Sequence, residues 1–111
     1  MRLYHNPRCS KSRQAVKLLT DKGVSFQEHR YLEKGIMEED LPILASLVGI
    51  IRKQEKEFKE LDFAVNSIND VIKVLRSKPK LLERPVLVKD GKAIIGRPPE
   101  DLLQLQPTST S

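Results

Sequence analysis

The spacing of apolar residues predicts a strand, a helix and a second strand at the start of the chain. Residues 2–5 form a short strand-like segment. A helical pattern begins at Ser10 or Ser12 and stops at Gly23. Its apolar face consists of Ala15, Val16, Leu18 and Leu19. Residues 24–31 then alternate imperfectly, which indicates a strand, and a unit of about 30 residues is long enough for a parallel crossover.

The middle of the chain, about 34–80, has helical periodicity and no strand candidate. A first apolar series with helical spacing comprises Leu41, Leu44, Ala45 and Val48. A second series comprises Ile68, Val71, Ile72 and Leu75. Ser67 and Asp70 resemble a capping box at its start, and Pro79 ends it. The charged stretch 52–61 between them predicts a short exposed helix or turn.

The C-terminal part predicts a β-hairpin followed by a helix. Two β-rich runs, 85–89 and 92–96, flank Asp90 and Gly91, which supply the positive φ angles of a tight turn. Residues 98–105 begin with prolines and acids, as the first turn of a helix does. The polar end of the chain, 106–111, is expected to be a flexible tail.

This order predicts an α/β protein with a mixed sheet: strand, helix, strand, helical insert, hairpin and helix. A parallel unit followed by an antiparallel hairpin and a closing helix resembles the thioredoxin-like arrangement. The length of 111 residues suits one core. We therefore expect a single domain over 1–105, with the helical insert at about 34–80 and the tail outside it.

Composition and charge narrow the classes of function. The 20 basic and 15 acidic residues give a net charge of +5, which suits an anionic ligand. Nucleic-acid binding is not expected, because the chain has only two tyrosines and three phenylalanines and no compact basic block. The longest apolar run, 41–51, contains Pro42 and Gly49 and is too short to cross a membrane. With no charged-then-apolar leader and one cysteine, a reducing cytoplasm is the expected location.

The single cysteine, Cys9, lies between the first strand and the first helix. A helix N-terminus offers unpaired N–H groups and a partial positive charge, which favour a thiolate. The surrounding segment adds four basic side chains: His5, Arg8, Lys11 and Arg13. A lone cysteine is often a small buried apolar residue, but polar neighbours argue against that interpretation here. The placement therefore predicts a reactive cysteine.

Four short motifs stand out along the chain: His5-x3-Cys9-x3-Arg13, Ile51-Arg52-Lys53, Leu82-Glu83-Arg84-Pro85 and Gly96-Arg97-Pro98. Through these motifs the chain resembles the glutaredoxin-coupled arsenate reductase family. The motifs occur in the family's order and cover nearly the whole chain. The resemblance implies that Cys9 is the nucleophile and that three arginines bind the oxyanion: Arg52, Arg84 and Arg97. It also implies a cis peptide bond before Pro85.

The resemblance further implies arsenate or a similar oxyanion as substrate, glutathione as co-substrate and glutaredoxin as partner, without a metal or a tightly bound cofactor. Arginine suits such a site because its guanidinium holds two oxygens and stays charged. His5 either helps to keep the thiolate ionised or satisfies the loop backbone. Arg13 is expected to have a supporting role, and Arg52 could instead be a solvated charge.

Two other functions stay open. Related regulators that bind RNA polymerase carry a Cys-x-x-Cys switch at this loop, whereas this chain has Ser12 at the second position. Serine cannot close a disulfide, which disfavours a switch of that type. A thiol- or glutathione-dependent reductase of another substrate fits the residues almost as well. With no second cysteine, any resolving thiol must come from another molecule.

Overall fold

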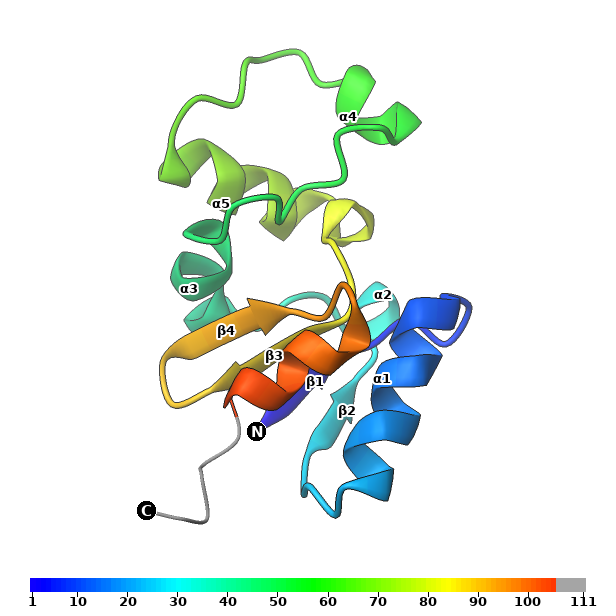
Figure 1. Cartoon of the computed structure of the whole chain (residues 1–111). Helices are drawn as coiled ribbons and strands as arrows, with labels where there is room; N and C mark the ends of the chain where they lie inside the picture. Colours follow the sequence, from blue (N-terminus) through cyan, green and yellow to red (C-terminus); the bar gives the residue numbers. More distant parts are fainter. Residues whose placement is uncertain (106–111) are drawn as a thin grey trace.

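The computed structural model describes residues 1–105 and has a four-stranded mixed sheet at its centre (Figure 1). The strands are β1 (Arg2–Tyr4), β2 (Gln27–His29), β3 (Val86–Lys89) and β4 (Lys92–Ile95), in the order β2-β1-β3-β4. β1 runs parallel to β2 and antiparallel to β3, and β3 and β4 form the predicted hairpin. The predicted α/β class with a mixed sheet is confirmed.

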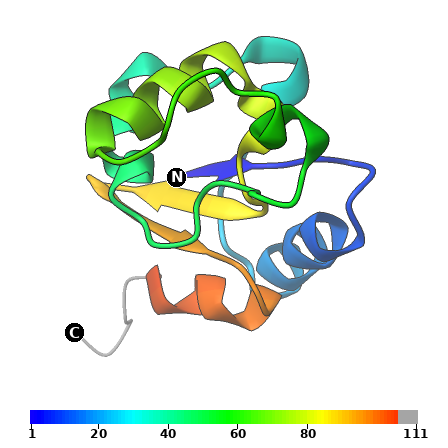
Figure 2. The same ribbon diagram turned by 90° about the horizontal axis from the view of Figure 1, so that it is seen from above.

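One face of the sheet is covered by α1 (Ser10–Asp21) and the 3₁₀ helix η3 (Pro99–Leu105) (Figures 1 and 2). Helix α1 spans the predicted range, and η3 replaces the last predicted helix with a tighter one. The buried core on this face comprises Leu3, Ala15, Leu19, Leu87 and Leu102. Because side chains alternate along a strand, β1 and β3 send their other residues to the opposite face.

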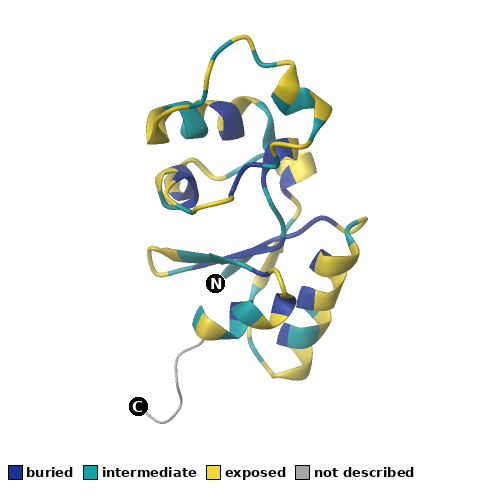
Figure 3. Ribbon diagram, turned by 45° about the horizontal axis from the view of Figure 1, so that its top comes forward, coloured by how far each residue is buried: buried dark blue, intermediate teal, exposed yellow. Residues whose placement is uncertain are grey.

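The insert covers that opposite face (Figures 1 and 3). Its helices are α2 (Tyr31–Lys34), η1 (Glu38–Asp40), α3 (Leu41–Ala45), α4 (Lys56–Lys59), α5 (Ile68–Ser77) and η2 (Pro79–Leu81). The larger core lies here, built from Tyr4, Tyr31, Leu41, Leu44, Ile50, Ile51, Val74, Leu75, Leu81, Leu82, Val86 and Val88. None of the helices within 1–105 has the length and apolar character that a membrane span requires.

A buried acid fastens the insert to the central strand. The Asp40 carboxylate accepts hydrogen bonds from Arg2 Nη1 and the Tyr4 hydroxyl, each at 2.5 Å. The Tyr4 hydroxyl in turn accepts the main-chain N–H of Met37 at 3.2 Å. Asp40 is almost fully buried, so these bonds compensate for the loss of water around its charge.

The predicted second strand, 24–31, is wrong at both ends. Only Gln27–His29 pair with β1, and Tyr31 already belongs to α2. Val24 and Phe26 instead pack against the core beneath α1. Val24 and Phe26 are apolar because they pack against that core. The strand at the edge of the sheet is short and pairs through only three residues.

Two positions in the insert also differ from the predicted helical pattern. Helix α3 ends at Ala45, and Val48 is 97% exposed beside Gly49, whose φ of 80° turns the chain. Ile68 is 54% exposed because it stands in the first turn of α5, outside the core. The predicted N-cap is present, since Ser67 accepts the N–H of Asp70 at 3.1 Å.

A short antiparallel pairing, which the sequence pattern did not predict, joins the insert to the segment before β3. Ile51 and Leu82 form an isolated bridge. The main-chain N–H of Arg52 donates to Leu81 at 2.8 Å, and that of Glu83 donates to Ile50 at 2.7 Å. This pairing fixes Arg52 beside Glu83.

Candidate active site

Cys9 is the N-cap residue of α1, with extended backbone angles just before the helix begins. The preceding turn is held by Asn6, whose main-chain oxygen accepts the N–H of Cys9 and whose side-chain oxygen accepts the N–H of Arg8, both at 3.0 Å. The side chain of Cys9 therefore stands at the positive end of a twelve-residue helix. This is the position that the sequence predicted for a reactive thiol.

The surroundings of Cys9 favour the thiolate. Partial burial raises the pKa of the thiol, but the main-chain N–H groups of Ser12 and Lys11 and the guanidinium of Arg84 lower it by more. The pKa of Cys9 therefore lies below its ordinary value. A larger fraction of the sulfur is then ionised near neutral pH.

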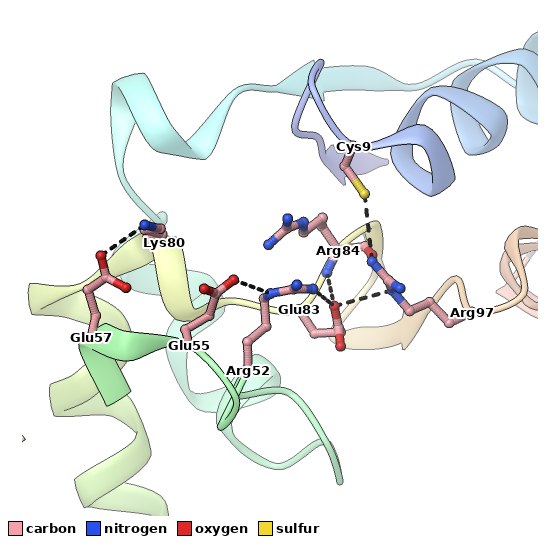
Figure 4. Close-up of polar contacts among 8 residues, drawn as sticks. All are labelled: Cys9, Arg52, Glu55, Glu57, Lys80, Glu83, Arg84 and Arg97. Carbon is pink, nitrogen blue, oxygen red and sulfur yellow. Dashed lines mark hydrogen bonds and ion pairs between the residues drawn. The ribbon is translucent and has the colours of Figure 1, made fainter. Parts of the chain in front are cut away.

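Arg97 also contacts the sulfur. Its Nη2 lies 3.6 Å from Cys9 Sγ, and its Nε donates to the main-chain oxygen of Arg84 at 2.8 Å (Figure 4). The N–H of Gly96 donates to the oxygen of Pro85 at 2.8 Å, which keeps the two Arg-Pro segments together. The bond between Arg84 and Pro85 is cis, as the resemblance implied, and so is the bond between Arg97 and Pro98.

Glu83 links the predicted arginines and was missed as a site residue. Its Oε1 lies 2.7 Å from Arg52 Nη1 and 3.2 Å from Arg97 Nε, and it accepts the main-chain N–H of Arg84 at 3.1 Å (Figure 4). Glu55 adds a second carboxylate 3.2 Å from Arg52 Nε. Arg52 is therefore a paired charge in the structure. The one sequence signal for Glu83 was its place next to Arg84 and Pro85.

His5 lies behind the cysteine loop and is buried. Its Nδ1 is 2.6 Å from Ser12 Oγ, which also accepts the main-chain N–H of Asn6 at 3.0 Å. Burial lowers the pKa of His5, and Arg30 and Arg13 lower it further, whereas Glu28 raises it. The Ser12 hydroxyl can donate a hydrogen bond to Nδ1 of a neutral His5. His5 therefore acts on Cys9 through the loop. Both interpretations of His5 from the sequence, support of the thiolate and support of the loop backbone, place it there.

Arg13 closes the same loop from outside. Its Nη1 donates to the main-chain oxygen of Pro7 at 2.9 Å, and the side chain is exposed. Arg13 thus holds the turn that presents Cys9, and its supporting role in the chemistry stays a prediction.

An open groove of about 880 Å³ begins at the arginine cluster and continues along the insert. Arg52, Glu83 and Arg97 form its polar end, and Val48 and Ile68 lie on its apolar side. Within 1–105 no three His, Cys, Asp or Glu side chains gather closely enough to hold a metal ion. What the geometry offers is one sulfur with a lowered pKa beside cations, which suits attack on an electrophilic anion.

A family model described as ArsC family matches residues 4–105. The chain belongs to the ArsC family. An arsenate reductase of Neisseria meningitidis (strain MC58) is 36% identical over 92% of this chain and 94% of its own. The structure described as an arsenate reductase from Vibrio cholerae aligns with a TM-score of 0.82 and 36% identity, covering 96% of this chain and 98% of the other. These likenesses confirm the family that the sequence motifs indicated.

The chain is also similar to proteins with other names. The uncharacterised protein YfgD of Escherichia coli (strain K12) is 40% identical over 95% of each chain. The regulatory protein MgsR of Bacillus subtilis (strain 168) is 31% identical, over 96% of this chain and 90% of its own. Membership in the family is therefore compatible with an enzyme or a regulator, and the residues of the site must distinguish them.

Proposed function

We propose that this protein is an arsenate reductase in which Cys9 is the nucleophile. The observation that carries the proposal is the contact of Arg97 with the Cys9 sulfur, 3.6 Å away, at a thiol whose pKa lies below its ordinary value. Arsenate is proposed as the substrate because similar proteins are named arsenate reductases.

The proposed first step joins two negative partners, a thiolate and an arsenate anion. Arg84 and Arg97 offset their repulsion and hold the arsenate oxygens while the Cys9 sulfur attacks arsenic. A sulfur–arsenic bond forms, and one arsenate oxygen leaves as hydroxide or water. Arsenic stays in the +5 state in this adduct, so the reduction itself requires electrons from further thiols.

The electrons are proposed to come from glutathione and glutaredoxin. Glutathione binds arsenic through its sulfur and displaces a second oxygen as water. A glutaredoxin thiol then attacks the glutathione sulfur to form a mixed disulfide, and the electron pair of the broken sulfur–arsenic bond reduces arsenic to the +3 state. Water replaces the Cys9 sulfur on arsenic, which releases arsenite and the free thiol. An external thiol is needed because Cys9 is the only cysteine of the sequence. The groove lined by Arg52 and Arg97 ends at Arg97, whose side chain contacts the Cys9 sulfur.

A coupled assay tests this function. Arsenate-dependent oxidation of NADPH is measured with glutathione, glutathione reductase and glutaredoxin, for the wild type and for Cys9→Ser. We expect steady turnover for the wild type and background rates for the variant, because serine is hardly ionised at neutral pH. Equal rates for the two proteins would rule out Cys9 as the nucleophile.

A second assay separates the reductase of another substrate from the arsenate enzyme. Omitting glutaredoxin, or replacing glutathione with another small thiol, is expected to slow arsenate turnover. A wild type whose Cys9 titrates well below an ordinary thiol, yet which reduces no arsenate under any of these conditions, would favour the other substrate. A regulatory role is less well supported, because the buried Ser12 bonds with His5 and cannot form a disulfide with Cys9.

A further inference from the structure

We propose that Tyr31 is a further residue of the oxyanion site, and that its hydroxyl donates a hydrogen bond to an oxygen of the anion bound beside Cys9. The inference rests on the proposed function only in taking an oxyanion as the ligand. Tyr31 was not among the residues singled out from the sequence.

The topology brings Tyr31 to the same edge of the sheet as the other site residues. Cys9 follows the end of β1, and Tyr31 follows the end of β2, which runs parallel to β1. Arg84 precedes β3, which is antiparallel to β1, and Arg97 follows β4. All four strands therefore place these residues at one edge, in the arrangement typical of ligand sites in α/β proteins.

The Tyr31 hydroxyl has an unused capacity for hydrogen bonding. The residue is completely buried, and its ring packs in the insert-side core with its centroid 6.3 Å from that of Tyr4. Among residues 1–105, only two buried side-chain polar atoms have no hydrogen-bond partner, the Tyr31 hydroxyl and Arg84 Nε. Buried polar groups are normally paired, and unpaired ones often mark a place where a ligand completes the network.

Both unpaired groups can donate a hydrogen bond. The charged groups that influence Tyr31 are residues of the candidate site. Burial raises the pKa of Tyr31 to about 12, with the charges of Arg84, Cys9, Arg52 and Glu83 as the other influences. The hydroxyl therefore keeps its proton at any pH at which the enzyme works. A neutral O–H donor binds an anionic oxygen without adding charge.

The test uses Tyr31→Phe, which removes the hydroxyl and keeps the ring. Titration calorimetry measures the binding of arsenate without glutathione, and of sulfate, which undergoes no reduction. We expect both dissociation constants to rise about tenfold, as for a lost hydrogen bond to a charged group. We also expect the midpoint of thermal unfolding without anion to stay the same or rise, because the removed hydroxyl had no partner.

Tyr4→Phe is the matched control, because the Tyr4 hydroxyl bonds Asp40 and Met37 within the same core. This variant should unfold at a lower temperature and bind both anions as the wild type does. Unchanged anion binding in Tyr31→Phe, or a loss of thermal stability equal to that of Tyr4→Phe, would overturn the proposal. Sulfate binding that depends on Tyr31 in a protein that reduces no arsenate would leave it standing while ruling out the proposed reaction.

Discussion

The two arginines that interact with the Cys9 sulfur, Arg84 and Arg97, differ in how many other groups their guanidinium groups contact. Arg97 is shared between the sulfur, the main-chain oxygen of Arg84 and the carboxylate of Glu83. The Arg84 side chain, by contrast, has a buried Nε without a partner among residues 1–105. A guanidinium with few hydrogen bonds to the protein can still form them with a thiolate or a substrate. Of these two arginines, Arg84 is the one whose charge lowers the pKa of Cys9, so its loss should change that pKa.

Replacing Arg84 with alanine is predicted to raise the pKa of Cys9. Arg84 stabilises the charged sulfur, so without it the thiolate forms at higher pH. If the thiolate is the nucleophile, the acidic limb of the pH profile of kcat/KM moves upward with that pKa. Thiolate absorbance near 240 nm during a pH titration measures the shift, with Cys9→Ser as the blank.

Arg8→Ala is the control for this prediction, since it removes an exposed positive charge next to Cys9 in the sequence. Its effect on the pKa of Cys9 should be small, because water and salt screen an exposed charge. Shifts of the same size in both variants would mean that the general positive charge of the region, and not the position of Arg84, controls the sulfur.

The paired arginines show why residue types alone did not settle the site. Arg52 lay in a charged stretch, where the sequence fits both a ligand of the oxyanion and a solvated charge. Its contacts with Glu55 and Glu83 depend on residues 3 and 31 positions away, and the second arises only from the pairing of 50–52 with 81–83. Sequence spacing carries no signal for such a long-range ion pair. Its role in oxyanion binding stays a prediction.

Elements whose signals are local were predicted well. Helix α1 has a continuous apolar face, and the hairpin turn has Asp90 and Gly91 with positive φ angles of 49° and 78°, as a two-residue turn requires. Residues 24–31 and the α3 pattern were less well predicted, because Val24 pairs with no strand and Val48 packs in no core. Periodicity identifies apolar residues, but tertiary contacts decide which of them are buried and in which element.

At the scale of elements, we predict that Asp40 holds the insert on the sheet. Asp40→Ala removes the acceptor that joins η1 to Arg2 and Tyr4, so the buried Tyr4 hydroxyl loses the acceptor for its proton and the partly buried Arg2 guanidinium loses its nearest carboxylate. Breaking such a pair typically lowers the free energy of unfolding by about 3–5 kcal/mol. Urea denaturation of the wild type and the variant measures the difference.

Glu39→Ala provides the comparison, because Glu39 is an exposed neighbour of Asp40 that lies 4.0 Å from the same Arg2 side chain. An exposed pair of this kind contributes about 0–1 kcal/mol. If both variants lose the same stability, burial of Asp40 is not what makes its contacts strong, and the anchoring role assigned to it is wrong.

On the scale of the whole molecule, the sheet connects two cores through alternate residues of the same strands. Leu3 and Leu87 belong to the core beneath α1, whereas Tyr4, Val86 and Val88 belong to the core beneath the insert. A strand that contributes to both cores cannot come apart on one face and stay ordered on the other. This argues that residues 1–105 unfold as the single domain predicted from the sequence, with the site at the common edge.

This coupling predicts that a destabilising substitution in one core also lowers the urea midpoint at which the other core unfolds. Leu102→Ala opens a cavity in the core beneath α1 and should lower the free energy of unfolding by about 2–5 kcal/mol. Both tyrosines, Tyr4 and Tyr31, lie in the opposite core, so their fluorescence reports on that core alone. In one cooperative unit, the urea midpoints from tyrosine fluorescence and far-ultraviolet circular dichroism fall together.

Gln104→Ala, at an exposed position of η3, is the control and should leave both midpoints unchanged. A tyrosine midpoint that stays at the wild-type value in Leu102→Ala would instead mean that the insert and the α1 side are separate folding units.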